Sequence, residues 1–242
     1  MHLSEYLTLR NKLKQSASKV ILRLIHAFIW RIKIVRIDNT TLFVPPNIFS
    51  PKFTITSELL ADVLMHELKE DDIVLDMGTG SGVLAIIAAR RSARVYATDI
   101  SLEALATAIL NAKINNVLDK ITFLKGSLFK PLGNLRFSLI LFNPPYLYGT
   151  PRSTYERAIV GDPYIIFAFL KEARDYLLPN GRILMTYSTI SPIKLLSHVL
   201  RLLHYKCDIV SHKRLPFETI FVLRLTLGED EGKLYFCNSV RY

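Results

Sequence analysis

The chain of 242 residues lacks the features that mark several large classes of protein. It has two cysteines, Cys207 and Cys237, whose spacing resembles no metal site. A disulfide scaffold is therefore excluded, and so few cysteines favour a reducing compartment, for which we expect the cytoplasm. The six histidines are scattered, so we predict no metal centre and no catalytic group built on His or Cys.

The chain also lacks an apolar run long enough to cross a bilayer. The candidate stretch, residues 20–30, is eleven residues long and contains Arg23 and His26, whereas a spanning helix needs about 20 residues. The basic region before it is too long for a signal peptide, and no small-residue cleavage site follows. We expect a helix that packs against the main domain, with binding to a membrane surface as the alternative.

Positive charge is concentrated at the start of the chain. Residues 1–36 carry eight Lys or Arg against one acid, a net charge of +7 out of +10 for the whole chain. This asymmetry predicts a basic helical N-terminal extension that meets a polyanion such as RNA, or a release factor that works on the ribosome. A solvated basic helix without a specific partner is the alternative. The remaining chain divides into a main domain, residues 37–227, and a polar tail, residues 228–242.

The main domain alternates strand-like and helix-like runs, which predicts a parallel sheet covered by helices on both faces. Two short strands are expected first, at 31–37 and 41–44, and a helix at 57–69. The predicted strands then lie near 73–76, 94–98, 121–124, 137–142, 182–187, 206–210 and 220–226, with helices near 82–91, 101–115, 162–177 and 191–204. Only a short turn separates the last two strands, so one of them must be antiparallel. We therefore expect an α/β, Rossmann-like, doubly wound and mostly parallel seven-stranded sheet with an antiparallel C-terminal strand.

A glycine-rich turn follows the first long strand. Asp76 precedes the run Gly78-Thr79-Gly80-Ser81-Gly82, and a helix is predicted next. Strand, glycine-rich turn and helix form the order in which a Rossmann-like sheet binds a nucleotide-sized ligand. The glycines let the backbone approach the ligand, and the start of the helix should offer free N–H groups. Val83 stands where the dinucleotide-binding fingerprint has its third glycine, so that fingerprint fails.

An acidic residue ends the next strand. Asp99 lies 23 positions after Asp76 and is followed by Ile100. A carboxylate at this position is suited to accept hydrogen bonds from both hydroxyls of an adenosine ribose.

A short polar segment follows the run 137–141. It reads Phe142-Asn143-Pro144-Pro145-Tyr146. The side-chain carbonyl of Asn143 and the peptide carbonyl of Pro144 are two acceptors suited to the two N–H bonds of a planar –NH2 group. Tyr146 can lie against that plane and exclude water. An ordinary loop after a strand is the alternative, because Asn and Pro are common in turns.

Together these motifs resemble class I S-adenosylmethionine-dependent methyltransferases that modify planar nitrogens. Residues 142–147 are most similar to the short archaeal and eukaryotic HemK-type protein-glutamine N5-methyltransferases, and the segments 171–183 and 217–225 also resemble that family. The similarity covers roughly residues 40 to 227. Two departures stand out: Ser127 occupies the place of an acidic residue that meets the adenine amino group, and residues 50–58 replace an acidic, serine-containing segment.

The resemblance implies a function and a set of site residues. S-adenosylmethionine would lie across the glycine-rich turn, and a protein glutamine in a peptide release factor is the favoured methyl acceptor. An adenine amino group in RNA or DNA is the first alternative, and a non-catalytic protein that binds RNA or a partner is the second. A small activator subunit is a further candidate partner. The expected cofactor-binding residues are Asp76, Gly78, Thr79, Gly80, Gly82, Asp99, Ile100, Ser127 and Asn143, and the expected catalytic residues are Asn143, Pro144 and Tyr146.

Overall fold

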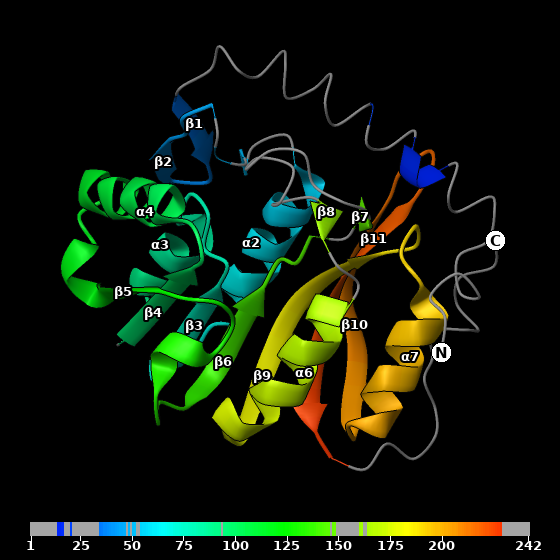
Figure 1. The fold of residues 1–242 in the computed structure, drawn as a ribbon. Coiled ribbons are helices and arrows are strands. Elements are labelled where there is room, and N and C mark those ends of the chain that lie inside the picture. Colours follow the sequence, from blue (N-terminus) through cyan, green and yellow to red (C-terminus); the bar gives the residue numbers. More distant parts are fainter. Residues whose placement is uncertain are drawn as a thin grey trace.

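A single seven-stranded sheet forms the centre of the molecule (Figure 1). The computed structural model describes residues 14–16, 20, 34–46, 48, 50–51, 54–92, 94–145, 147–148, 160–161 and 164–228. The strand order is β10-β11-β9-β6-β3-β4-β5. The strands are β3 (Ile73–Met77), β4 (Arg94–Asp99), β5 (Ile121–Lys125), β6 (Phe137–Phe142), β9 (Leu177–Ser188), β10 (Tyr205–Arg214) and β11 (Thr219–Leu227).

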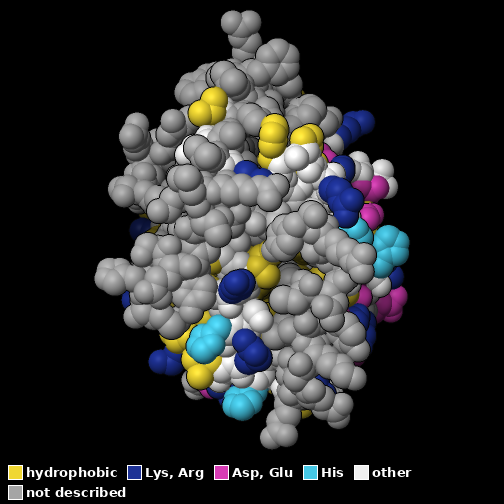
Figure 2. Space-filling view, turned by 90° about the vertical axis from the view of Figure 1, so that its right-hand side faces the viewer, with side chains coloured by type: hydrophobic (Ala, Val, Ile, Leu, Met, Phe, Trp, Pro, Cys, Tyr) yellow, Lys and Arg dark blue, Asp and Glu magenta, His cyan; other side chains and the backbone are white. Residues whose placement is uncertain are grey.

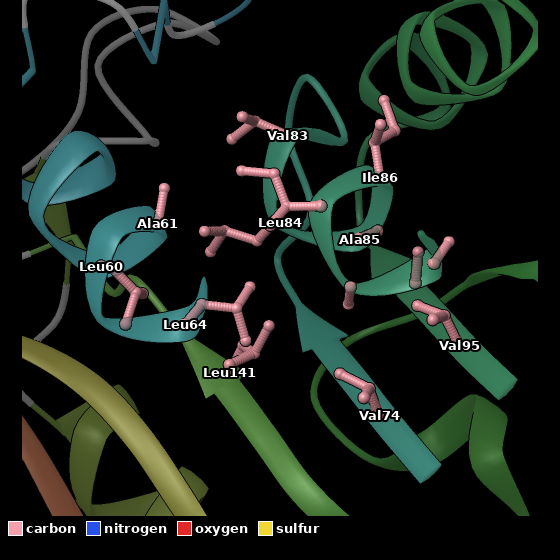
Figure 3. Close-up of a cluster of buried hydrophobic side chains, with 14 of the residues drawn as sticks. Leu60, Ala61, Leu64, Val74, Val83, Leu84, Ala85, Ile86, Val95 and Leu141 are labelled. Atoms are coloured by element: carbon pink, nitrogen blue, oxygen red, sulfur yellow. The ribbon is translucent and has the colours of Figure 1, made fainter. Parts of the chain in front are cut away.

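Helices cover both faces of this sheet, and each face has its own apolar core. On one face lie α2 (Ile55–Glu67), α3 (Val83–Ala89) and α4 (Leu102–Ile114), and on the other lie α6 (Tyr164–Tyr176) and α7 (Ile193–Leu202). Two short 3-10 helices, η2 (Leu118–Lys120) and η3 (Lys130–Leu132), flank β5. Figure 3 shows the first core, where Leu60 and Leu64 of α2 point toward Leu84 of α3 and Leu141 of β6. All four side chains are buried, so α2 is held against α3 and the sheet.

The predicted fold class is confirmed. The strands β3, β4, β5, β6 and β9 pair in parallel, and β11 pairs antiparallel with both β9 and β10. The prediction that β9 begins at residue 182 is wrong, because α6 runs directly into a strand that starts at Leu177. The Pro179-Asn180-Gly181 segment has the composition of a turn, but it is absorbed as a register shift against β6, with Asn180 at φ +61°.

A small hairpin precedes α2 and packs against α4. It consists of β1 (Ile34–Ile37) and β2 (Thr40–Phe43), which pair antiparallel. Asn111 of α4 accepts a hydrogen bond from the Phe43 N–H and donates to the Phe43 carbonyl and to the Ser81 carbonyl. One side chain therefore joins the hairpin to the glycine-rich turn.

The predicted extension and tail lie mostly outside the described residues. Only residues 14–16, 20 and 34–36 of the extension and Gly228 of the tail are described, so the division of the chain at 36 and 228 stays a prediction. Gln15 is buried and donates a hydrogen bond to the Ile190 carbonyl. Among the helices of the described residues, none is both long and apolar enough to cross a membrane.

A buried ion pair joins three strands at the amino edge of the sheet, opposite the carboxyl ends. Arg182 of β9 donates to both carboxylate oxygens of Asp72, at 3.0 and 2.8 Å, and Ser138 of β6 donates to the same carboxylate. Burial opposes ionisation of Asp72, but the hydrogen bonds from Arg182, Ser138 and the Lys69 N–H lower its pKa below the ordinary value. This pair ties β9 to β3 across β6.

Candidate active site

One cavity of about 390 Å³ lies at the carboxyl ends of β3, β4 and β6. This is the edge at which an open α/β sheet binds its ligands. Of the residues predicted to bind cofactor or acceptor, the cavity is lined by Asp76, Gly78, Thr79, Gly80, Asp99, Ile100, Ser127, Asn143 and Pro144. Gly82 is not among the lining residues, and Tyr146 lies outside the described residues. Three motifs that are far apart in the sequence therefore share one cavity.

The glycine-rich turn bends into the cavity through two left-handed glycines. Gly78 has φ +72° and Gly80 has φ +56°, a region that side chains with a Cβ rarely adopt. A Cβ built on Gly78 meets no atom within 4 Å. The backbone of this turn is consequently open to close approach by a ligand.

Several N–H groups of the turn donate hydrogen bonds within the protein. Those of Gly78 and Thr79 both donate to the Thr98 carbonyl, that of Gly80 to Asp99, and that of Gly82 to the Thr79 carbonyl. The prediction of free N–H groups concerned the start of α3, and it is wrong there for Gly82, which caps the helix, and for Ala85, whose N–H donates to Asp76. Gly82, with φ +84°, instead lies against α4, since an added Cβ would come within 2.9 Å of the Ala108 Cβ. Its role in the structure is close packing of the turn on that helix.

Asp76 is a buried carboxylate at the floor of the cavity. Its side chain is 1% exposed, and Oδ2 accepts hydrogen bonds from the Thr79 hydroxyl at 2.7 Å and the Ala85 N–H at 3.1 Å. Burial raises the pKa of Asp76 to about 6, although both hydrogen bonds lower it. Asp76 thus joins the turn to the first residues of α3 by hydrogen bonds.

Asp99 joins the turn to the start of α4. Its Oδ2 accepts from the Gly80 N–H at 3.0 Å, and its Oδ1 accepts from the Ser101 N–H at 2.9 Å. Burial raises the pKa of Asp99, and these backbone hydrogen bonds oppose the rise. Each carboxylate oxygen has more than one acceptor position, so each still has capacity for a ligand hydroxyl. Beside it, Ile100 is 65% exposed at the cavity wall, and Ser127, also exposed, lines the same cavity.

The Asn-Pro-Pro segment leaves β6 in a restricted conformation. Asn143 and Pro144 each precede a proline, and this position disfavours helical backbone angles. Neither Pro144 nor Pro145 has an N–H group, so no donor of their own competes for the nearby carbonyls. Pro144 is buried and Asn143 is half-buried in the cavity wall. The Asn143 side chain is therefore held where a ligand group in the cavity can reach it.

Two hydroxyl groups that the sequence analysis did not predict hold the Asn143 amide. Nδ2 donates to Ser57 of α2 at 3.0 Å, and Thr186 of β9 donates to Oδ1 at 2.6 Å. The polar segment 50–58, which the sequence analysis treated only as a departure from the family pattern, contributes Pro51, Thr56 and Ser57 to the cavity wall. The contact of Thr186 with Asn143 follows from the sheet order. Phe142 pairs with Met185, so the next residues of the two strands are neighbours.

A glycine that was also missed brings a later segment back to the prolines. The short strands β7 (Leu147–Tyr148) and β8 (Val160–Gly161) pair in parallel directly after the Asn-Pro-Pro segment. A Cβ added to Gly161 would lie 2.6 Å from the Pro145 Cγ. Only glycine allows this approach without a shift of Pro145.

Comparisons with known proteins agree with one another. Residues 39–214 match the family described as Methyltransferase small domain. A Methanocaldococcus jannaschii protein, provisionally named a protein N5-glutamine methyltransferase, is 31% identical over 204 residues, covering 78% of this chain and 97% of that protein. A release factor glutamine methyltransferase of Deinococcus radiodurans is 36% identical over 144 residues, 53% of this chain, and the chain spans only 51% of its length. The solved structure of a ribosomal protein L11 methylase from Lactobacillus delbrueckii subsp. bulgaricus has a TM-score of 0.57 at 22% identity, covering 74% of this chain and 82% of that one, and shares the fold.

Proposed function

Because the chain belongs to the methyltransferase small domain family, we propose that it methylates the side-chain amide nitrogen of a glutamine in a protein. It is an S-adenosylmethionine-dependent methyltransferase, and the favoured target is a peptide release factor. The observation that carries the proposal is that Asn143, after β6, and Asp99, at the end of β4, line one cavity on either side of the end of β3. Relatives named for glutamine methylation of release factors and of ribosomal protein uL3 support this class of acceptor. A target that works in translation favours a cytoplasmic enzyme.

The cavity has the properties that S-adenosylmethionine requires. Its volume of about 390 Å³ lies within the range of roughly 300–1,000 Å³ that is usual for small-molecule sites. Asp99 retains acceptor capacity for ribose hydroxyls, and the open space in front of Gly78 admits a ligand against the backbone. Ile100 is a large apolar side chain left 65% exposed at the wall, which suits an adenine face. When bound, the cofactor supplies an electrophilic methyl group on a sulfonium sulfur.

The residues of the chain then have to orient the acceptor. Asn143 Oδ1 and the Pro144 carbonyl accept the two N–H bonds of the glutamine amide, and the nitrogen lone pair points out of the amide plane. Amide nitrogen is a weak nucleophile, and two accepted hydrogen bonds concentrate electron density on it during the transfer. No base is needed beforehand, because the proton leaves after the methyl group has arrived. Alignment of the two reactants supplies most of the rate, and Tyr146 is assigned the stacking role against the amide.

An adenine amino group offers the same two N–H bonds, and the positive charge of this protein favours it as the alternative methyl acceptor. The segment 1–36 carries a net charge of +7, which would assist binding to RNA or DNA. On the face shown in Figure 2, the Lys and Arg side chains of the described residues lie interspersed with acidic, His and apolar side chains. We assign contact with a polyanion to the N-terminal segment because of its charge.

The experiment that tests the proposal compares three acceptors with one labelled cofactor. The full chain is incubated with labelled S-adenosylmethionine and, separately, a purified release factor, ribosomal proteins and total RNA. Peptide mass spectrometry should locate the added methyl group on a glutamine side chain. Methylated adenine in the RNA arm would establish the alternative acceptor, and label in none of the arms would refute methyl transfer to these targets.

Asn143→Ala separates catalysis from cofactor binding. Removal of one preorganised hydrogen-bond partner should lower turnover by about 10²-fold or more. Asn143 was also expected among the cofactor-binding residues, but its Oδ1 is assigned to the methyl acceptor, so cofactor affinity, measured by calorimetry, should stay within about threefold, equivalent to less than 1 kcal/mol. Asn39→Ala, at an exposed position of the β1–β2 turn, is the matched control and should have normal turnover. An Asn143→Ala enzyme that is as fast as the wild type would show that the segment is only a loop.

A further inference from the structure

The amide of Asn143 is held at both ends by buried hydroxyl groups. Ser57 is 4% exposed and Thr186 is 1% exposed, and they come from α2 and β9, on either side of the strand end that carries Asn143. Ser57 Oγ accepts from Nδ2 at 3.0 Å, and Thr186 Oγ1 donates to Oδ1 at 2.6 Å. Water has little access to either hydroxyl, so it cannot readily replace one that is removed.

We propose that Ser57 and Thr186 are positioning residues that fix the plane and direction of the Asn143 amide for methyl transfer, an inference that rests on the proposed function. A side-chain amide held at one end turns about its last torsion, which is broad in asparagine. An amide held at both ends does not turn without breaking a hydrogen bond between buried groups.

The two hydrogen bonds also set how many hydrogen-bonding positions of the Asn143 amide remain for the glutamine that receives the methyl group. Oδ1 has two acceptor positions and Nδ2 has two N–H bonds. Thr186 occupies one acceptor position and Ser57 takes one N–H. A single acceptor position of Oδ1 therefore remains for one N–H of the incoming –NH2 group. Donation from Nδ2 to Ser57 polarises the amide and strengthens Oδ1 as an acceptor.

Thr186 allows the cleaner test because it does not line the cavity, whereas Ser57 does. Thr186→Val removes the hydroxyl and keeps the shape and the strand preference of the side chain. A loosened Asn143 should lower kcat by about tenfold or more, because small displacements at a reacting centre are costly. The KM for the protein acceptor and the Kd for the cofactor should change by less than about threefold, since no direct contact is lost.

Two further variants distinguish positioning from packing. Thr186→Ser restores a hydroxyl in a smaller side chain and should return kcat to within about threefold of the wild type. Thr40→Val is the matched control: Thr40 is fully buried in β2, and its hydroxyl has no hydrogen-bond partner among the described residues. That variant should leave kcat unchanged. Wild-type kcat in Thr186→Val, or an equal loss in Thr186→Val and Thr186→Ser, would overturn the proposal.

A second measurement does not depend on the identity of the acceptor. In ¹⁵N-labelled protein, the side-chain –NH2 signals of Asn143 are those that disappear in Asn143→Asp. Hydrogen exchange of the N–H that Nδ2 donates to Ser57 should be slow in the wild type and at least about tenfold faster in Ser57→Ala and Thr186→Val. Unchanged exchange in both variants would refute positioning even in an enzyme that methylates glutamine. Absence of glutamine methylation by the wild type would instead refute the proposed function and leave the exchange result to decide on positioning.

Discussion

The buried carboxylate of Asp76 makes a quantitative prediction about stability. Asp76 is 1% exposed, and burial raises its pKa from the ordinary value of 3.8 to about 6. The folded protein therefore prefers the protonated side chain. The contribution of protonated Asp76 to the free energy of unfolding is fully present below pH 3.8 and is lost as the pH rises through about 6. A shift of about two pKa units corresponds to about 3 kcal/mol.

Asp76→Asn should remove this loss. The asparagine side chain stays neutral, and its Oδ1 can accept both hydrogen bonds that Asp76 Oδ2 accepts from Thr79 and Ala85. The difference in unfolding free energy between variant and wild type should be about 0.5 kcal/mol at pH 4 and should rise to about 3 kcal/mol in favour of the variant at pH 7. For a chain of this size, that gain corresponds to a melting temperature about 6–12 °C higher.

Urea denaturation of the cofactor-free protein at several pH values measures this difference, because the other titrating groups, apart from Asp99, whose charge also raises the pKa of Asp76, behave alike in both proteins and cancel. Asp71→Asn, at an exposed aspartate just before the same strand, controls for the loss of a carboxylate. A difference that does not vary between pH 4 and pH 7 would refute the assignment of a raised pKa to Asp76. A less stable variant at pH 7 would show that the protein stabilises the charged form.

Three further predictions concern the cofactor, the acceptor and the macromolecular target. Asp99→Ala should weaken S-adenosylmethionine by about 1.5–3 kcal/mol in calorimetry, the scale of lost charge-assisted hydrogen bonds; unchanged affinity would mean that the ribose is bound elsewhere. Gly161→Ala should lower kcat by about tenfold while cofactor affinity holds, because its Cβ would displace Pro145 from a distance of 2.6 Å; normal kcat would show that this segment yields without moving the prolines. Glutamine substitutions of the Lys and Arg residues in 1–36, with Gln15 retained, should raise the KM for the macromolecular substrate most strongly at low salt. If the salt dependence of KM matches that of the wild type, the segment plays no part in the encounter.

The parts of the site that follow directly from strand ends could be predicted from the sequence. Asp76, Asp99 and Asn143 each follow or end an apolar run, and parallel strands bring their carboxyl ends to the same edge of the sheet. That argument needs only the order of strands and helices. It places the three residues close together, and in the structure they line one cavity.

The residues that orient Asn143 could not be predicted in the same way. Thr186 lies in the run Met185-Thr186-Tyr187, where a β-branched side chain is ordinary in a strand. Its contact with Asn143 depends on β9 being the neighbour of β6 and on the register between them. Ser57 meets Asn143 only because α2 crosses that end of the sheet, 86 residues earlier in the chain. Contacts of this kind are set by tertiary packing, which periodicity does not report.

The position of β11 has a consequence for how the protein is made. The last described strand in the sequence lies between β9 and β10, not at an edge of the sheet. Strands β3 to β6 are complete once residue 142 has been synthesised, so the half that carries the glycine-rich turn can assemble while the rest of the chain is still being translated. Until residues 219–227 emerge from the ribosome, β9 exposes an unpaired edge and β10 has no neighbour, a state that favours aggregation. Premature termination before Thr219 would therefore split the sheet next to Thr186. In a fold whose last strand lies at the edge of the sheet, a truncation of equal length would remove only that edge.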